Sequence, residues 1–235
     1  MALRAITLKR ARMLSQKVRE LTFDPGAGFP FTAGQWVSLK LPLAALGEPL
    51  ARSYSIASAP RADDSFDIAV TRVEDGPGSN FLHAMTVGDV IESADPTGFF
   101  TLPTKFERPL LLVGTGTGVA PLRAMIQSLH HLPAAPPLTL LFGVRHREDL
   151  IYADEFAALA ARHPTFRFEP TLSRPPAGWI GRIGYVQHHL PTMLSAMPEA
   201  DVYLCGLNAM VRDARKVLRD ALGLPRERVR SERFD

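Results

Sequence analysis

The chain has 235 residues, 46% of them hydrophobic and 22% charged, which is the size and composition of a globular protein with one large or two small domains. Its net charge of +3 fits an anionic ligand or an acidic partner and is far too small to indicate nucleic-acid binding. The single cysteine, Cys205, excludes an internal disulfide and any cluster that needs several thiolates. No secretory signal and no apolar run of bilayer-spanning length is visible, so we expect a cytoplasmic protein without membrane insertion.

The first hundred residues predict short strands separated by turns rich in glycine and proline. Residues 3–9 and 17–23 show the two-residue alternation of half-buried strands, and further strands are expected at 35–41, 66–73 and 90–93. A short helix over 81–85 is also expected, with Ser79 or Asn80 as its N-terminal cap. This run of short strands indicates an antiparallel barrel or sandwich.

The most informative stretch of this half is Arg-Ser-Tyr-Ser-Ile-Ala-Ser at residues 52–58. In a strand, alternate side chains share a face, which places Arg52, Tyr54 and Ile56 on one side and Ser53 and Ser55 on the other. One face then presents a guanidinium group that suits a phosphate and a phenol ring that suits a flat ligand. The alternative is an ordinary barrel strand with a surface arginine and a half-buried tyrosine.

Beyond a charged, proline-containing linker at 103–109, the pattern changes to alternating strands and helices. The expected strands are 110–113, 138–144, 166–172, 202–205 and 229–234. The expected helices end near His131, Arg162, Leu194 and Leu222. This alternation predicts a five-stranded doubly wound α/β domain, which binds ligands at the carboxyl ends of its strands.

A glycine-rich turn, Gly-Thr-Gly-Thr-Gly at residues 114–118, follows the first of these strands. Glycines between a strand and a helix let the backbone approach a phosphate, and the helix N-terminus supplies N–H donors. The turn is not the Rossmann fingerprint, because its glycines alternate and no acidic residue follows about twenty positions later. The alternative is a tight strand–helix connection.

Five motifs occur in a fixed order along the chain, namely Arg-Ser-Tyr-Ser-Ile-Ala-Ser, Gly-Pro-Gly-Ser-Asn, Gly-Thr-Gly-Val-Ala-Pro, Cys-Gly and a terminal Glu-Arg-Phe. Through them the chain resembles, over nearly its whole length, the ferredoxin–NADP reductase superfamily of flavoproteins. The resemblance implies a six-stranded antiparallel β-barrel at 1–103 that holds FAD. It also implies an α/β doubly wound parallel sheet at 104–235 that binds NADPH or NADH and presents the nicotinamide to the flavin.

The resemblance assigns flavin contacts within the barrel. Arg52 matches the arginine on the flavin pyrophosphate, Tyr54 the residue packed on the ring or ribityl chain, and Ser55 the serine beside flavin N5. Gly78 and Ser79 match a second phosphate contact at a helix start. The remaining implied flavin contacts are Ser53, Val70, Arg72, Asn80 and the C-terminal aromatic residue, Phe234, which stands where tyrosine is commoner.

In the second domain, the resemblance implies that Gly116, Thr117 and Gly118 hold the nucleotide phosphates. It places Cys205 and Gly206 near nicotinamide C4, where the thiol would position the ring, although a lone cysteine is more often an inert buried residue. Glu232 matches the C-terminal acid of the family and joins Ser55 and Cys205 as the candidate catalytic residues. The alternative for Glu232 is a solvated charge on a strand.

The choice between NADPH and NADH depends on an arginine cluster. Ser173, Arg174 and Arg182 resemble the group that clamps the 2′-phosphate of NADPH, and Arg145 follows the neighbouring strand. Relatives that use NADH also carry Ser-Arg at this place, so both nucleotides stay open.

The function that the resemblance implies is an FAD-dependent NAD(P)H reductase that passes electrons singly to a separate acidic carrier, namely ferredoxin, flavodoxin or an oxygenase component. The alternatives are a free-flavin or quinone reductase and a non-catalytic FAD-binding subunit of a larger complex. We expect a monomer. No metal is expected, because the histidine pairs at 130–131 and 188–189 have adjacent spacing, which is poor geometry for a metal site.

Overall fold

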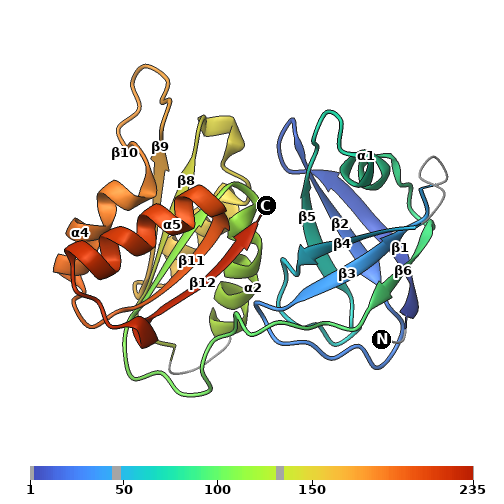
Figure 1. The fold of residues 1–235 in the computed structure, drawn as a ribbon, viewed down its shortest axis with the longest axis horizontal. Helices are drawn as coiled ribbons and strands as arrows, with labels where there is room; N and C mark the ends of the chain where they lie inside the picture. The colour runs from blue at the N-terminus through green and yellow to red at the C-terminus, as the bar shows by residue number, and fades with distance from the viewer. Residues whose placement is uncertain (1–2, 44–48, 131–134, 235) are drawn as a thin grey trace. The chain divides into compact units, whose positions relative to one another are not determined.

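The computed structural model describes residues 3–43, 49–130 and 135–234. The chain divides into two compact units, the first made of residues 1–102 and 123–131 and the second of residues 103–122 and 132–235. Figure 1 shows an all-strand sheet with one short helix among residues 3–102 of the first unit and a helix-covered sheet in the second. In the described part of the chain, no helix has both the length and the hydropathy that crossing a bilayer requires.

The first unit is a six-stranded antiparallel sheet with the strand order β4-β3-β6-β1-β2-β5. Its strands are β1 (Leu3–Met13), β2 (Val18–Asp24), β3 (Trp36–Leu41), β4 (Leu50–Ser55), β5 (Phe66–Thr71) and β6 (Val90–Ala94). The two edge strands meet at a corner, where Ile56 forms an antiparallel bridge with Ile68 and the Ala57 N–H donates to the Asp67 carbonyl at 2.7 Å. The predicted six-stranded antiparallel barrel is confirmed.

Alternating side chains of these strands fill the barrel. In β3 the buried residues Val37, Leu39 and Leu41 alternate with half-exposed ones, and the same period of two places Ile6 and Leu8 of β1 inside. β1 continues four residues beyond its predicted end at Lys9, with a register shift between Leu8 and Arg10 where it pairs with β2. The strand β1 is therefore longer and more irregular than the simple pattern predicts.

The helix of the first unit, α1 (Pro77–Ala84), begins earlier than predicted. Proline stands at its start, where its fixed φ and missing N–H are tolerated, and Gly76 is the N-cap without a side-chain cap bond. The prediction that Ser79 or Asn80 caps a helix over 81–85 is therefore wrong. Both residues lie inside α1 and bond backward to the turn before it.

The second unit is a six-stranded parallel sheet with the order β10-β9-β8-β7-β11-β12. Its strands are β7 (Leu110–Thr115), β8 (Leu138–Val144), β9 (Phe166–Leu172), β10 (Arg182–Ile183), β11 (Asp201–Leu207) and β12 (Val229–Phe234). The sequence predicted five of them. The two residues of β10 are too few to show a periodicity, and they lie between Gly181 and Gly184, so the pattern did not reveal this edge strand.

Helices cover both faces of this sheet. They are α3 (Ala153–Arg162), α4 (Val186–Ala196) and α5 (Asn208–Lys216), and α5 continues as a π-helical turn, Val217–Ala221. The helix α2 (Val119–His130) is divided between the units, because its residues from Arg123 onward belong to the first. Leu111 and Val113 of β7 pack in one core with α4 and α5, which Figure 1 shows side by side on one face. On the opposite face Phe156 of α3 contacts Phe168 of β9, with ring centroids 5.4 Å apart. The doubly wound arrangement is confirmed, and it explains why β7 is apolar throughout. The predicted end of α2 at His131 lies outside the described residues.

Candidate functional site

The structure brings together two candidate phosphate contacts of the first unit, Arg52 on β4 and Gly78 in the first turn of α1. A Cβ atom at Gly78 would lie 3.4 Å from Cγ of Arg52 and 3.2 Å from Cδ1 of Leu41. The helix start therefore approaches the strand closely because residue 78 has no side chain. Arg52 is exposed, and its Nη1 donates to the carbonyl of Ala51 at 2.9 Å, so the guanidinium group stays on the surface beside α1.

The other residues of the Arg-Ser-Tyr-Ser motif pass from the surface into the barrel. Ser53 is exposed, Tyr54 is half-buried against the barrel core, and Ser55 is buried. Burial raises the pKa of Tyr54, and the charge of Arg52 acts in the opposite direction. The predicted alternation ends at Ser55, because the residues after it, Ile56 to Ser58, are all buried in the closing corner rather than alternating between faces.

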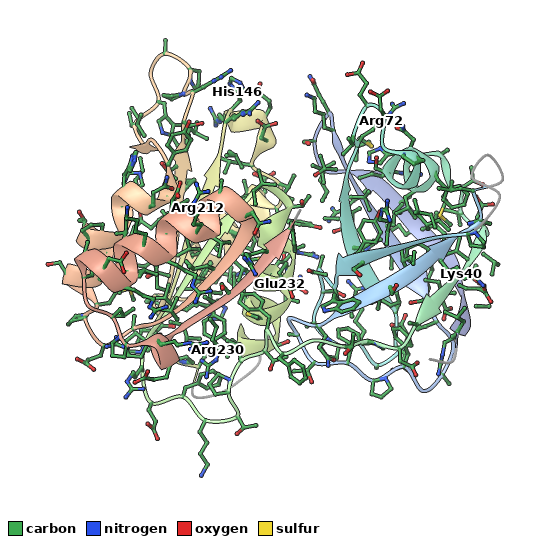
Figure 2. All side chains as sticks on the ribbon, viewed as in Figure 1. Lys40, Arg72, His146, Arg212, Arg230 and Glu232 are labelled. Atoms are coloured by element: carbon green, nitrogen blue, oxygen red, sulfur yellow. The ribbon has the colours of Figure 1, made fainter. Side chains whose placement is uncertain are left out.

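A third group of candidate flavin contacts surrounds the turn before α1. Arg72, labelled in Figure 2, donates from Nε to Oδ1 of Asn80 at 3.1 Å. Ser79 Oγ accepts the N–H of Val73 at 3.0 Å and donates to the Gly76 carbonyl at 3.0 Å. Val70 has a buried side chain, and its carbonyl is hydrogen-bonded to His83 Nε2 of α1 at 2.8 Å. These residues fold one compact turn around the helix start.

In the second unit, the glycine turn packs against the end of β11. Gly116–Gly118 form a single 3₁₀ turn before α2, with Gly116 exposed and at φ +53°. A Cβ atom at Gly118 would overlap the carbonyl oxygen of Cys205 and lie 2.7 Å from its carbonyl carbon. A Cβ atom at Gly206 would likewise lie 2.7 Å from Met210 Cε. The predicted phosphate turn therefore lies next to Cys205 and Gly206, the predicted nicotinamide contacts. Thr117, at the centre of the turn, is half-exposed.

Cys205 is fully buried on β11 and lies in register between Gly114 of β7 and Glu232 of β12. Burial raises the pKa of the thiol well above 9.0, and the nearby charge of Glu232 raises it further. The sulfur is therefore a neutral thiol near pH 7. Glu232, which Figure 2 labels, is half-buried on β12. Phe234 follows two residues later, in register with Leu207 of β11.

The arginine cluster gathers at the carboxyl ends of β8 and β9. The Ser173 N–H donates to the Val144 carbonyl at 3.0 Å, and the Arg174 N–H donates to the Arg145 carbonyl at 2.9 Å. Arg145 and Arg174 are thus neighbours, and both are exposed. The roles of these residues as nucleotide contacts stay predictions.

Arg182 is held by a residue that the sequence analysis did not identify. Its Nε donates to Oε2 of Glu169 on β9 at 3.0 Å, with both side chains about one third exposed. The indole N–H of Trp179 donates to the Arg182 carbonyl at 2.9 Å and fixes the backbone of β10. Glu169 is an acidic residue in a strand, and its position beside Arg182 depends on β10, the strand that the pattern did not reveal.

A basic hollow on α5 was also missed. It is lined by Val211, Arg212, Arg215, Lys216, Arg219, Asp220 and Arg233. Four of its cations have the spacing i, i+3, i+4 and i+7, which places them on one helix face, so this signal was present in the sequence. Figure 2 labels Arg212 on this helix.

Comparisons with known proteins find family models and relatives that together match nearly the whole chain. The model of an oxidoreductase FAD-binding domain matches residues 5–102, and that of an oxidoreductase NAD-binding domain matches residues 112–216. Ferredoxin–NADP reductase B of Sorangium cellulosum is 46% identical over 97% of this chain and 96% of its own length. The toluate 1,2-dioxygenase electron transfer component of Pseudomonas putida is 32% identical, and the match covers 90% of this chain and 62% of that protein.

The fold has equally clear relatives among solved structures. The crystal structure of a ferredoxin NADP⁺ reductase from Neisseria gonorrhoeae with bound FAD and NADP superimposes with a TM-score of 0.84 over 99% of both chains, at 24% sequence identity. The cytochrome P450 reductase of Amycolatopsis superimposes with a TM-score of 0.86 over 99% of this chain and 70% of its own, at 29% identity.

Proposed function

The chain belongs to the ferredoxin–NADP reductase family of FAD-dependent NAD(P)H oxidoreductases, and we propose that residues 1–103 bind FAD and residues 104–235 bind NADPH or NADH. Two close backbone approaches support the proposal. Gly78 meets Arg52 in the first unit, and Gly118 meets Cys205 in the second. At both places the missing side chain lets the backbone at a helix start pack closely on a neighbouring strand, and the free N–H groups of a helix start suit a phosphate.

On the flavin side, the residues fit a dinucleotide with a flat ring. Arg52 is an exposed cation next to the start of α1, which suits the pyrophosphate, and Ser79 and Asn80 shape the turn that precedes the helix. Tyr54 packs its ring on the barrel core and offers an apolar surface to the flavin. Ser55 holds a hydroxyl next to flavin N5. Bound FAD would supply the exchange between two-electron and one-electron chemistry.

On the nicotinamide side, the residues position the ring sterically and do not act as nucleophiles. The N–H groups of Gly116–Gly118 face the nucleotide phosphates at the start of α2. Cys205 stays a neutral thiol and positions the nicotinamide ring sterically, with Gly206 leaving room beside it. Glu232 lies in register with Cys205 and is the acidic residue of the proposed site, and Phe234, in register with Leu207, is the proposed aromatic contact.

NADPH is the favoured nucleotide. Exposed Arg145 and Arg174 and half-buried Ser173 form a group at the ends of two strands, which suits the dianionic 2′-phosphate. Arg182 completes the group, with its Nε bound by Glu169 and its terminal nitrogens available to a phosphate.

The electron acceptor is a small acidic redox protein. The matching oxygenase components and ferredoxin–NADP reductase B are named for electron transfer to separate proteins. The hollow on α5 supports an acidic partner, because five of its seven lining residues are cations and one is an acid. We place the protein in the cytoplasm as a monomer, which size-exclusion chromatography and fractionation of cells would test.

The decisive experiment uses the purified protein without added cofactor. A yellow protein with FAD as the released flavin, which oxidises NADPH faster than NADH when a dye accepts the electrons, is the expected result. Rapid reduction of free flavin in preference to a ferredoxin or flavodoxin would instead identify a free-flavin reductase. Retention of FAD without oxidation of either nucleotide would identify a non-catalytic subunit, and a colourless protein that does not bind FAD would contradict the proposal.

A further inference from the structure

A buried cluster of charges lies beneath the corner where the barrel closes. Glu20 of β2 and Asp67 of β5 are at most 1% exposed, and Arg123 of α2 is 6% exposed. Nη1 of Arg123 lies 3.3 Å from Asp67 Oδ2 and 3.6 Å from Glu20 Oε2. Arg61 adds a hydrogen bond to Asp67 Oδ1 at 3.0 Å. The free-energy cost of desolvating buried charges is about as large as the free energy gained from their attraction. A contribution to stability alone therefore does not explain the cluster.

The cluster leaves one atom unsatisfied. In the described part of the chain, Glu20 Oε2 is buried without a hydrogen-bond partner, although it lies in ion-pair range of Arg123. Arg123 directs its Nη1 instead to the carbonyl of Ala57, at 2.8 Å. The geometry of Arg123 is therefore set by a backbone carbonyl of the Arg-Ser-Tyr-Ser-Ile-Ala-Ser motif as well as by the carboxylates.

A second side chain of α2 holds the same segment. Gln127 lies four residues after Arg123 and so on the same helix face, and its Oε1 accepts the N–H of Ala59 at 3.0 Å. The two side chains of α2 thus hold a carbonyl at Ala57 and an amide at Ala59. Both contacts lie within the first unit.

The segment that they hold begins directly after Ser55. The Ile56 N–H donates to the Gln35 carbonyl at 2.9 Å, the Ala57 N–H donates to the Asp67 carbonyl at 2.7 Å, and the Asp67 N–H donates to Ser58 Oγ at 3.0 Å. The backbone thereby passes from its pairing near β3 to its pairing with β5. Ser55 is the last residue of β4 before this crossing, so the contacts of the crossing fix the backbone on the carboxyl side of the serine.

We propose that Arg123 and Gln127 are positioning residues for Ser55. They fix the backbone after the serine, and this keeps its hydroxyl in one orientation toward flavin N5. The inference rests on the proposed function, because it assumes that FAD occupies the barrel with N5 at Ser55. The carboxylates of Glu20 and Asp67 orient the Arg123 guanidinium for this task.

The test compares four variants of the FAD-containing protein. Gln127→Leu removes the acceptor for Ala59 and keeps the side-chain size. The double variant Arg123→Met with Glu20→Gln removes one buried cation and one buried anion together. Asp67 then keeps its pair with Arg61, and Arg12, which loses its ion pair with Glu20, is half exposed to solvent. Ser128→Ala is the matched control, because among the described residues the Ser128 hydroxyl donates to the Ala124 carbonyl of the same helix, at 3.0 Å.

The measurements are FAD content, thermal midpoint, the midpoint potential of the bound flavin, and kcat and KM with NADPH. Gln127→Leu and the double variant should keep their FAD, show a shifted flavin potential, and lose about tenfold in kcat with KM nearly unchanged, since small misplacements of reacting groups have effects of this size. Arg123→Lys, which retains a cation and a donor, should lie closer to the unmodified protein.

Flavin potentials and kcat values equal to those of Ser128→Ala would overturn the inference, even if the thermal midpoints fall, because the two residues would then be structural only. Loss of FAD from Gln127→Leu would overturn it too. If the double variant does not fold, Gln127→Leu alone decides. Failure of the proposed function shows itself differently, since the unmodified protein would then lack FAD or NAD(P)H oxidation.

Discussion

At the scale of single residues, Cys205 combines complete burial with a raised pKa. The thiol should therefore resist iodoacetamide in the native protein at pH 8 and react at once after denaturation in guanidinium chloride, because only the exposed thiolate is the nucleophile. Mass spectrometry of the alkylated protein measures this. Rapid modification of the native protein would contradict both the burial and the assignment of a purely steric role.

The environment of Asp67 predicts how the stability of the folded protein changes in acid. Burial acts to raise its pKa, but hydrogen bonds and charge from Arg61, with help from Thr22 and Arg123, lower it below the usual 3.8. A carboxyl group with a lowered pKa in the folded state contributes stability that is present above pH 3.8 and is lost as the pH falls through the lowered value.

Asp67→Asn should therefore destabilise the protein at pH 7, by about 3–5 kcal/mol if breaking a buried pair has its usual effect, and the loss should shrink in acid. Urea unfolding at pH 7 and at pH 3 measures the difference. Asp63→Asn is the control, because Asp63 forms an exposed pair with Lys9 and should change stability much less. Equal effects of the two substitutions would contradict the role of the buried cluster.

At the scale of elements, the close packing of the glycine turn on β11 makes Gly118 the critical glycine. Gly118→Ala should lower the free energy of unfolding by about 1–3 kcal/mol, as overpacking does, and should weaken NADPH binding by moving the start of α2. Calorimetry and nucleotide titration test both effects.

Gly116→Asn is the matched control for this turn. Nothing lies within 4 Å of the added Cβ at residue 116, and asparagine tolerates its φ of +53°. This variant should keep nearly the stability of the unmodified protein. Equal destabilisation by both substitutions would show that backbone conformation, rather than contact with Cys205, limits the turn.

The arginine cluster at the ends of β8 and β9 predicts nucleotide preference. Arg174→Ala and Arg182→Ala should each raise KM for NADPH by about tenfold or more, since a hydrogen bond to a charged group contributes about 1.5–3 kcal/mol, and should leave KM for NADH nearly unchanged. Steady-state kinetics with both nucleotides measures the ratio. Equal losses with NADPH and NADH would defeat the assignment to the 2′-phosphate.

At the scale of the whole molecule, the sequence predicted most elements but not their contacts. β8, β9 and β12 have their predicted bounds because each is a continuous pattern flanked by turn residues, whereas β10 has two residues and no pattern at all. The start of α1 was missed because Ser79 and Asn80 suited a cap equally well from sequence, and only the backbone shows their bonds to the preceding turn.

The same limit applies to the site. The motifs singled out Arg52, Gly78, Gly118 and Cys205, and the structure brings these residues together in pairs within each unit. The partners of the motifs were not predictable, because Glu169 beside Arg182 and Arg123 beside Ala57 depend on which chain segments the fold brings together. Sequence patterns identify helices, strands and candidate ligand-binding segments, whereas tertiary packing determines which charged side chains lie next to one another.

The basic hollow on α5 predicts that electron transfer to an acidic carrier depends on the salt concentration. Reduction of an acidic ferredoxin should slow as salt rises from about 0.01 to 0.15 M, because the Debye length falls from about 30 to 8 Å, while NADPH-driven reduction of a neutral dye should change little. Arg215→Glu should slow carrier reduction at low salt. Arg10→Glu, an exposed site on β1, makes the same change in net charge and should have much less effect.

The burial of the single thiol in the sequence makes the protein suitable for labelling at one chosen position. Since Cys205 is buried and no other cysteine occurs in the sequence, a cysteine introduced on the exposed side of α5, for instance Arg212→Cys, would be the sole thiol open to a maleimide dye. Such a labelled protein would report by fluorescence when a carrier arrives at that helix, without any need to strip the native sulfur first.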